Sequence, residues 1–383
     1  MHESEAMAVL LSARIGYAAR EAALMRAGSA RALLGEPGAY AQALGEKGLG
    51  ALRRAMEGAD RLLETLYDGG VHLIVRGSEG YPERLLQTAR PPHLLFCLGR
   101  AALDDEAALA VVGTRRPSAY GLRHTHAIAR ELAAAGVCIV SGLALGIDAQ
   151  AHEGALAGGG RTVAVLGSAL DRMYPMENAA LMARIVEAGG SVISEYPPGT
   201  APTRYSFLER NRIIAGLSLG VLVTEGGKRS GALSTAHHAL EEGREVFALP
   251  GDVDRESASL PNRLIAEGAT PVACGGDVLR LLVRERADGR AQRMRPARED
   301  GTRAVGAAGR GEPAAGSPPA AQEAEAPNDR EAAVLALLSQ SDMDFDQLCA
   351  RTEMDSDELG ALLMLMELDG RIESLPGDRY RHA

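Results

Sequence analysis

The sequence predicts an α/β protein built on a doubly wound, mostly parallel sheet, with a smaller domain on each side. Short apolar runs alternate with helical patterns through the middle of the chain. Because these runs are apolar throughout, the strands are expected to be covered on both faces, as in parallel sheets. The predicted strands are residues 110–112, 137–140, 162–166, 191–194, 219–224, 245–249 and 271–273, with an added strand at 94–98.

Residues 1–72 predict a small helical domain of the SAM or helix-hairpin-helix kind. Its helical patterns lie at 6–15, 20–27, 30–34 and 49–66, and glycine-containing turns separate them. Basic and acidic residues are balanced here, which favours a structural or protein-contacting role over a grip on nucleic acid.

The sheet domain is predicted at 73–285, and a separable segment follows it. Residues 286–328 show no periodicity and contain glycine and proline pairs, so they are interpreted as a flexible linker. Residues 329–383 show three helical patterns, at 330–338, 345–352 and 356–369, and then a hairpin. Three helices and a hairpin predict a winged helix.

Charge and composition limit the choice of partners. The net charge is −10, but residues 329–383 hold 5 basic and 13 acidic residues, a net of −8, so the rest of the chain is nearly neutral and can carry a local basic patch. The four cysteines are far apart, as in buried thiols of a reducing compartment. No leader and no apolar run of about 20 residues is present, so we expect a cytoplasmic protein without membrane contact.

Small polar turns follow the predicted strands, and ligands of open α/β sheets bind there. The first strand stops at Gly113, and a turn with Arg115 and Ser118 leads into a helix, whose N-terminus offers backbone N–H groups to an anion. If the strand order is 3-2-1-4-5-6, the crevice lies between this strand and the one ending at Ser194. Residues 203–212 would then line the wall opposite Arg115.

Common cofactors do not fit this crevice. The first turn lacks G-x-G-x-x-G, and the second strand ends in Ser141-Gly142 instead of an acidic residue. Residues 226–230 lack the spaced glycine of a phosphate-binding P-loop. We therefore expect no NAD, no ATP and no other cofactor.

Catalytic and metal-binding patterns are also weak. Asp148 and His152 are four residues apart on a predicted helix, but no third ligand occurs at a telling spacing. A helix-capping aspartate and a structural histidine are the favoured interpretation. His237 and His238 are likewise assigned to the scaffold, and no catalytic residue or metal ligand is predicted.

The crevice does carry groups suited to single-stranded nucleic acid. Residues 203–231 hold five basic and two acidic residues, and Phe207 offers a ring on which a base can stack. Ser168 and Ser230 lack a His/Asp relay and are interpreted as phosphate or backbone donors. The alternative stays open at this point: Phe207 can belong to the core, and the arginines can pair with neighbouring carboxylates.

Taken together, these motifs resemble the DNA-processing protein A (DprA/Smf) family over residues 75–285. The matching motifs are VVGTR at 111–115, SGLALGIDA at 141–149, AVLG at 164–167, ISEYPPG at 193–199, RNRIIAGL at 210–217, SGAL at 230–233 and ALPG at 248–251.

The resemblance implies an extended Rossmann-like, doubly wound, mostly parallel sheet. It also implies a non-enzymatic dimer that binds single-stranded DNA without sequence specificity, and that loads a RecA-type recombinase onto incoming DNA in natural transformation. The implied contacts, together with the turn residues that would cradle phosphates, are Arg115, Arg204, Phe207, Asn211, Arg212, Ser230, Gly113, Ser118, Ser168 and Lys228.

Two other functions remain as alternatives. A Rossmann-like nucleotide phosphoribohydrolase would use a glycine-rich loop with a nearby glutamate, and Glu225-Gly226-Gly227 matches part of that pattern. A regulator could instead bind duplex DNA through the winged helix. The net charge of −8 in 329–383 favours protein contact or autoregulation for this domain, because phosphate neutralisation needs surface lysine or arginine.

Overall fold

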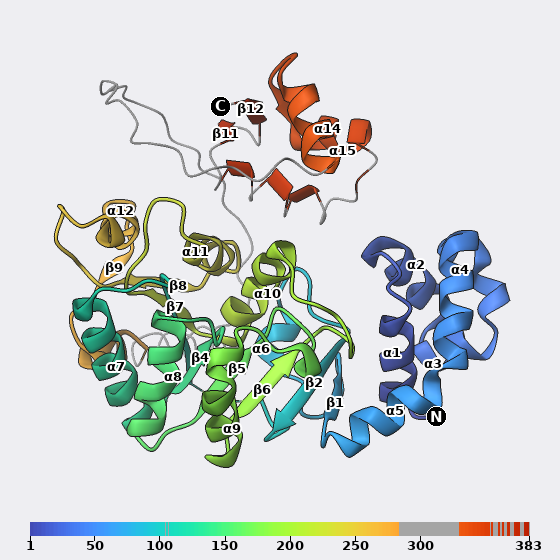
Figure 1. Cartoon of the computed structure of the whole chain (residues 1–383), viewed down its shortest axis with the longest axis horizontal. Coiled ribbons are helices and arrows are strands. Elements are labelled where there is room, and N and C mark those ends of the chain that lie inside the picture. The colour runs from blue at the N-terminus through green and yellow to red at the C-terminus, as the bar shows by residue number, and fades with distance from the viewer. Residues whose placement is uncertain are drawn as a thin grey trace, which may run out of the picture.

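A computed structural model of the chain describes residues 1–103, 105, 107–282, 329–352, 354, 359–360, 362–363, 366–367, 371–375 and 379–382. A three-layer α/β body occupies the centre, with an N-terminal group of helices beside it and a small C-terminal domain above it (Figure 1). This confirms the predicted fold class. The predicted linker, 286–328, lies outside the described residues.

The described part of the central body holds a nine-stranded sheet with the order β1-β2-β6-β5-β4-β3-β7-β8-β9. Pairing is parallel from β6 to β9, whereas β2 pairs antiparallel with both β1 and β6. The strands are β1 (His72–Val75), β2 (Leu94–Gly99), β3 (Ala108–Val112), β4 (Cys138–Ser141), β5 (Thr162–Val165), β6 (Ser191–Ser194), β7 (Gly220–Val223), β8 (Glu245–Ala248) and β9 (Thr270–Pro271).

The strand order 3-2-1-4-5-6 assumed above is wrong for this sheet. β6 is separated from β3 by β5 and β4, and β7 is the strand beside β3. Successive strands β3 to β6 extend the sheet in one direction, and the chain then returns through α10 (Arg204–Leu217) to start β7 on the other side of β3. The point of reversal therefore lies between β3 and β7, and not between β3 and β6.

Helices cover both faces of the sheet, as the apolar strands require. The helices α7 (Ala119–Ala134) and α8 (Ile147–Ala157), together with helical residues 275–282, share one core with the sheet, and α9 (Ala179–Glu187) packs beside them. The opposite face carries α6 (Glu83–Leu86), α10, α11 (Ala232–Glu241) and α12 (Ser259–Ala266).

The N-terminal region is helical as predicted, with two differences. Its helices are α1 (Glu3–Ser12), α2 (Tyr17–Ala27), α3 (Ala30–Gly35), α4 (Ala41–Glu57) and α5 (Ala59–Asp68). The single helix predicted at 49–66 is thus two helices that meet at Gly58. The strand β1 is not among the predicted strands, because four residues between a helix and a turn carry little periodicity. Leu94 and Phe96 of β2 join the core of this helical group.

The C-terminal domain has the predicted winged-helix elements. They are α14 (Asp329–Leu338), α15 (Phe345–Thr352) and a three-stranded sheet of β10 (Met343–Asp344), β11 (Ile372–Leu375) and β12 (Arg379–His382). Residues 359–360, 362–363 and 366–367 are helical, within the third predicted helix.

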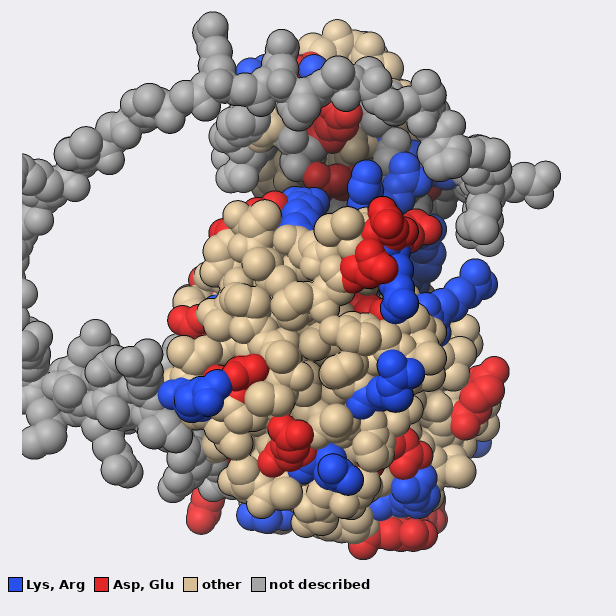
Figure 2. All heavy atoms as spheres, turned by 90° about the vertical axis from the view of Figure 1, so that its left-hand side faces the viewer, with Lys and Arg blue, Asp and Glu red and all other residues tan. Residues whose placement is uncertain are grey.

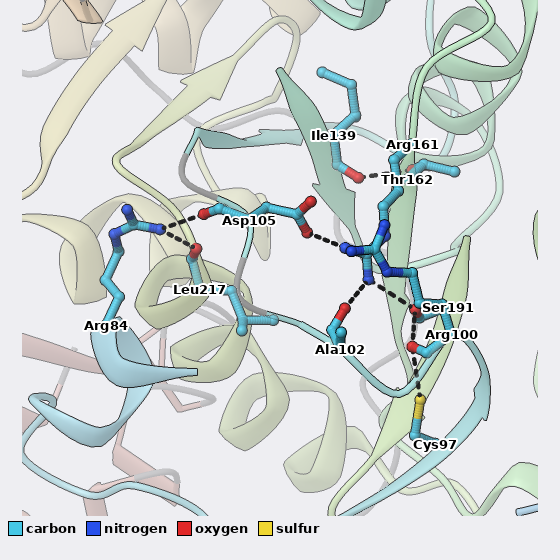
Figure 3. Close-up of polar contacts among 10 residues, drawn as sticks. All are labelled: Arg84, Cys97, Arg100, Ala102, Asp105, Ile139, Arg161, Thr162, Ser191 and Leu217. Atoms are coloured by element: carbon cyan, nitrogen blue, oxygen red, sulfur yellow. Dashed lines mark hydrogen bonds and ion pairs between the residues drawn. The ribbon is translucent and has the colours of Figure 1, made fainter. Parts of the chain in front are cut away.

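A network of hydrogen bonds holds the connection from β2 to β3 in place (Figure 3). This connection lies at the end of the sheet opposite the predicted crevice. Arg161 donates to Asp105 Oδ2 at 2.7 Å and to Ser191 Oγ at 3.2 Å. Arg84 donates to the carbonyl oxygen of Leu217 at 3.1 Å. These contacts are internal to the protein, so we assign this cluster to the fold.

Among the described helices, none combines the length and the apolar character that crossing a membrane would need.

Candidate nucleic-acid interface

The start of α10 is fixed against the end of β5. Thr203 and Ser206 form a reciprocal cap, in which each hydroxyl accepts from the other's backbone N–H at 3.0 Å. Ser206 Oγ also donates to the carbonyl oxygen of Gly167. A Cβ at Gly167 would lie 2.7 Å from Phe207 Cδ1, so only glycine permits this approach. The first turn of α10 is therefore held in one position, and Phe207 with it.

Phe207 lies among charged and aromatic groups. The guanidinium of Arg115 lies over the ring, 5.3 Å from its centroid, and that of Arg210 is 5.9 Å away. The ring of Tyr174 is 5.8 Å from that of Phe207 and tilted by 48°. The structure thus brings together the two predicted contacts Arg115 and Phe207. It does so because α10 contacts β5, β4 and β3 on its way from β6 to β7.

Arg210 is a buried scaffold residue beneath this site. It donates to the carbonyl oxygen of Gly142 at 2.8 Å and to that of Val165, so it joins the ends of β4 and β5. Burial lowers the pKa of Arg210 to about 10, while the carboxylate of Asp148 opposes that shift. At neutral pH Arg210 keeps its charge and adds positive potential beneath Phe207.

Two other predicted contacts have partners within the protein. Asn211 is buried, accepts from Arg210 Nε at 3.2 Å and donates to the carbonyl oxygen of Gly231 at 3.2 Å. Arg212 pairs with Glu195 and donates to the carbonyl oxygen of Arg90 at 2.7 Å. Direct DNA contacts by Asn211 and Arg212 remain predictions, and each would require the side chain to leave these partners.

The anion position at the start of α7 is occupied by the protein itself. Ser118 donates its backbone N–H to Glu225 Oε2 at 2.8 Å and its hydroxyl to Oε1 at 2.6 Å. Thr114 N–H bonds the carbonyl oxygen of Glu225 at 2.7 Å. A buried carboxylate therefore takes the position that the sequence assigned to an external anion. Gly113 belongs to the same packing, since a Cβ there would lie 2.7 Å from that carbonyl oxygen.

The remaining predicted residues differ in exposure. Ser168 is fully buried, and its hydroxyl has no hydrogen-bond partner among the described residues. Ser230 accepts from the N–H of Ala232 at 3.4 Å at the start of α11. Arg115, Arg204 and Lys228 are exposed. On the face shown in Figure 2, basic side chains lie toward the upper right, below the C-terminal domain, and acidic side chains lie among them.

No group of three or more metal-binding side chains occurs in the residues that the structure describes. Asp148 Oδ2 accepts from Gly142 N–H at 3.1 Å, and His152 Nδ1 lies 2.7 Å from Thr162 Oγ1. Burial lowers the pKa of His152 to about 3, so the ring is neutral. These contacts agree with the structural interpretation of both residues.

Sequence reasoning missed two features of this site. The sequence assigned Glu225 to a glycine-rich loop or to an arginine pair, and the contact with Ser118 was not predicted because 107 residues separate the two in sequence. Tyr174 is not among the predicted contacts. The available signal was the pattern Arg172, Tyr174, Met176, which places a cation, an aromatic ring and an apolar side chain at alternate positions after a strand.

Comparisons with known proteins agree with this architecture. A family model described as DNA recombination-mediator protein A matches residues 72–283, and one for the DprA winged helix domain matches 318–378. Protein Smf of Escherichia coli is 46% identical over 211 residues, which cover 55% of this chain and 56% of that protein. The match thus spans little more than half the length of that relative.

Two solved structures are similar over most of their own length. The X-ray structure of DNA processing protein A from Streptococcus pneumoniae aligns with a TM-score of 0.63 and 35% identity, covering 73% of this chain and 97% of that chain. DNA processing protein A from Helicobacter pylori, described for its single-stranded DNA binding mode, aligns with a TM-score of 0.50 and 32% identity. It covers 56% of this chain and 96% of that chain.

Proposed function

The chain belongs to the DNA recombination-mediator protein A family, and from this premise and the site geometry we propose that it binds single-stranded DNA without sequence specificity. The observation that carries the proposal is the placement of Arg115 over Phe207 at the carboxyl ends of the strands. A guanidinium for the phosphates and a ring for the bases are the two components of single-strand recognition. The Helicobacter pylori relative is described as binding single-stranded DNA.

The proposal extends to the role of the bound strand. We propose that the protein acts as a dimer and passes the strand to a RecA-type recombinase, as the family resemblance implies. We propose no catalytic activity. The acidic C-terminal domain is proposed to contact protein instead of duplex DNA, because it carries a net charge of −8.

The carboxylate of Glu225 argues against the phosphoribohydrolase alternative. It is buried and engaged by Ser118 and by Ser257 Oγ, which donates at 3.2 Å. A hydrolytic acid would need to reach a substrate, and a nucleotide phosphate at the start of α7 would meet this negative charge. Incubation with nucleoside monophosphates should therefore release no free base.

Salt-dependent affinity for a thymidine oligonucleotide tests the proposed site. Arg115→Ala should weaken binding and reduce the slope of log affinity against log salt by about 0.7, the value for one phosphate contact with a single strand. Phe207→Ala should weaken binding and leave the slope unchanged, because stacking releases no counterions. Arg184→Ala serves as the control, since this exposed arginine on α9 pairs with Glu153. Parent-like affinity in both site variants would show that the strand binds elsewhere.

A further inference from the structure

The connection from β5 to α9 carries a second set of groups suited to single-stranded DNA. Its side chains alternate between solvent and core over residues 172–176. Arg172, Tyr174 and Met176 are 64%, 49% and 68% exposed, whereas Met173 and Pro175 between them are buried. A cation, an aromatic ring and an apolar side chain therefore point outward in succession from one short segment.

This segment is held in place at both ends. Asn178 donates to the carbonyl oxygens of Leu143 at 2.9 Å and Ala144 at 3.1 Å. The carboxylate of Asp171 accepts from the N–H of Gly199 at 3.0 and 3.1 Å. A ring on a fixed segment loses little conformational entropy when a base stacks on it.

Tyr174 extends the site at Phe207 and is the more accessible of the two rings. The two ring centroids are 5.8 Å apart. Phe207 packs on the backbone of Gly167 and has two guanidinium groups near it, whereas about half of Tyr174 faces solvent. Arg172 comes two residues before Tyr174, and its Nε forms a long ion pair of 4.0 Å with Asp171 Oδ2, a distance too great for a hydrogen bond.

We propose that residues 172–176 form a second contact strip for the single strand. In this strip Tyr174 stacks on a base adjacent to the one at Phe207, and Arg172 pairs with a phosphate. The inference rests on the proposed function and adds a second stacking face to it. Two neighbouring faces would favour a strand with unpaired bases over a duplex, whose bases are already stacked on one another.

Fluorescence can test the stacking directly, because the chain contains no tryptophan. Tyr174→Trp would introduce a single reporter at the proposed contact. A thymidine oligonucleotide should quench it, whereas an abasic strand of the same length should quench it much less, because it carries the same phosphates without bases. Tyr67→Trp is the matched control, since Tyr67 is 56% exposed and lies on α5 of the N-terminal helices. Equal quenching of the Tyr174→Trp reporter by both strands would overturn the stacking role.

Affinity measurements separate this inference from the proposed function. Tyr174→Ala should weaken binding of the thymidine oligonucleotide about 5- to 20-fold, within the range measured for loss of one stacking ring, without changing the salt slope. Tyr174→Phe should bind like the parent, and Arg172→Ala should lower the slope. Thermal melting of each variant checks that it is folded.

The outcomes are distinguishable. If Tyr174→Ala and Tyr67→Ala both bind like the parent while Phe207→Ala is weakened, the second strip is refuted and the proposed function stands. If the parent protein binds neither thymidine nor abasic strands, the proposed function fails and the second strip fails with it.

Discussion

The side chain of Glu225 changes the interpretation of the turn that follows β3. The turn after β3 has the form of an anion site, with a helix N-terminus and small residues. In the folded chain the anion is the carboxylate of Glu225, which bonds Ser118 through two oxygens. A phosphate of a bound strand would therefore have to be contacted by side chains, and Arg115 is the one that we propose. This is the reason that the site is better suited to a flexible strand than to a single nucleotide held at a helix terminus.

The burial of His152 leads to a testable prediction about the pH dependence of stability. It is fully buried, and burial lowers its pKa from 6.5 to about 3. Between these two values the unfolded chain binds a proton that the folded chain does not. The free energy of unfolding should therefore fall as the pH drops below 6.5, by about 1.4 kcal/mol per pH unit from this residue.

Denaturant unfolding of the parent and of His152→Asn between pH 6 and pH 4 measures this contribution. The variant should lose stability less steeply with falling pH, since the asparagine side chain does not titrate. His72→Asn is the control, because His72 is exposed on β1. Identical pH dependence in the parent and in His152→Asn would show that the histidine is not held neutral.

At the scale of elements, α10 organises the site. Its first turn carries Phe207, and its next turn carries Arg210, which joins the ends of β4 and β5. One face of the helix thus presents the predicted DNA contact, while the residue three positions later anchors the helix to the sheet. The strand order sets the path of this helix across β5, β4 and β3, and this path brings Phe207 beside Arg115.

The close contact of α10 with Gly167 leads to a prediction about the position of this helix. Gly167→Ala would place a methyl group 2.7 Å from Phe207 Cδ1 and 3.0 Å from the carbonyl oxygen of Ser206. The helix start must shift, at a cost of about 1–3 kcal/mol in stability. The affinity for single-stranded DNA should also fall, because the shift moves Phe207 away from Arg115.

Gly35→Ala is the matched control, since a Cβ there meets no atom within 4 Å. Chemical denaturation gives the stability of each variant, and titration with a thymidine oligonucleotide gives the affinity. A stable Gly167→Ala protein with parental affinity would contradict the close packing of α10 on β5.

At the scale of the whole molecule, the C-terminal domain lies against the helix that carries the site. Tyr205 of α10 packs on the core of that domain. Its neighbours on the same helix include the predicted DNA contacts Arg204 and Phe207. Burial lowers the pKa of His237 on α11, and the carboxylate of Glu367 from the C-terminal domain opposes that shift. An acidic domain thus contacts the protein beside a predicted DNA site.

This arrangement predicts the effect of removing residues 329–383. Single-strand affinity should stay the same or rise, because the deletion removes a net charge of −8 from the neighbourhood of the site. Measurements over several salt concentrations, with single-stranded and duplex DNA, check the prediction. A large loss of affinity for either DNA in the truncated protein would instead assign DNA binding to the winged helix.

The sequence by itself determined the fold class and most strands, and it predicted a binding site at their carboxyl ends. It could do so because buried parallel strands are apolar throughout and the turns that follow them are rich in glycine and small polar residues. It also indicated Arg115 and Phe207 as partners across the crevice. Their direct contact with DNA remains a prediction.

Tertiary structure alone decided the strand order, the anion at α7 and the accessibility of each predicted contact. These depend on pairings between residues far apart in sequence, such as Ser118 with Glu225 and Arg212 with Glu195. A charged residue looks the same in sequence whether it faces solvent or a buried partner. The position of Tyr174 beside Phe207 follows from the same cause, because it arises only when α10 crosses the end of β5.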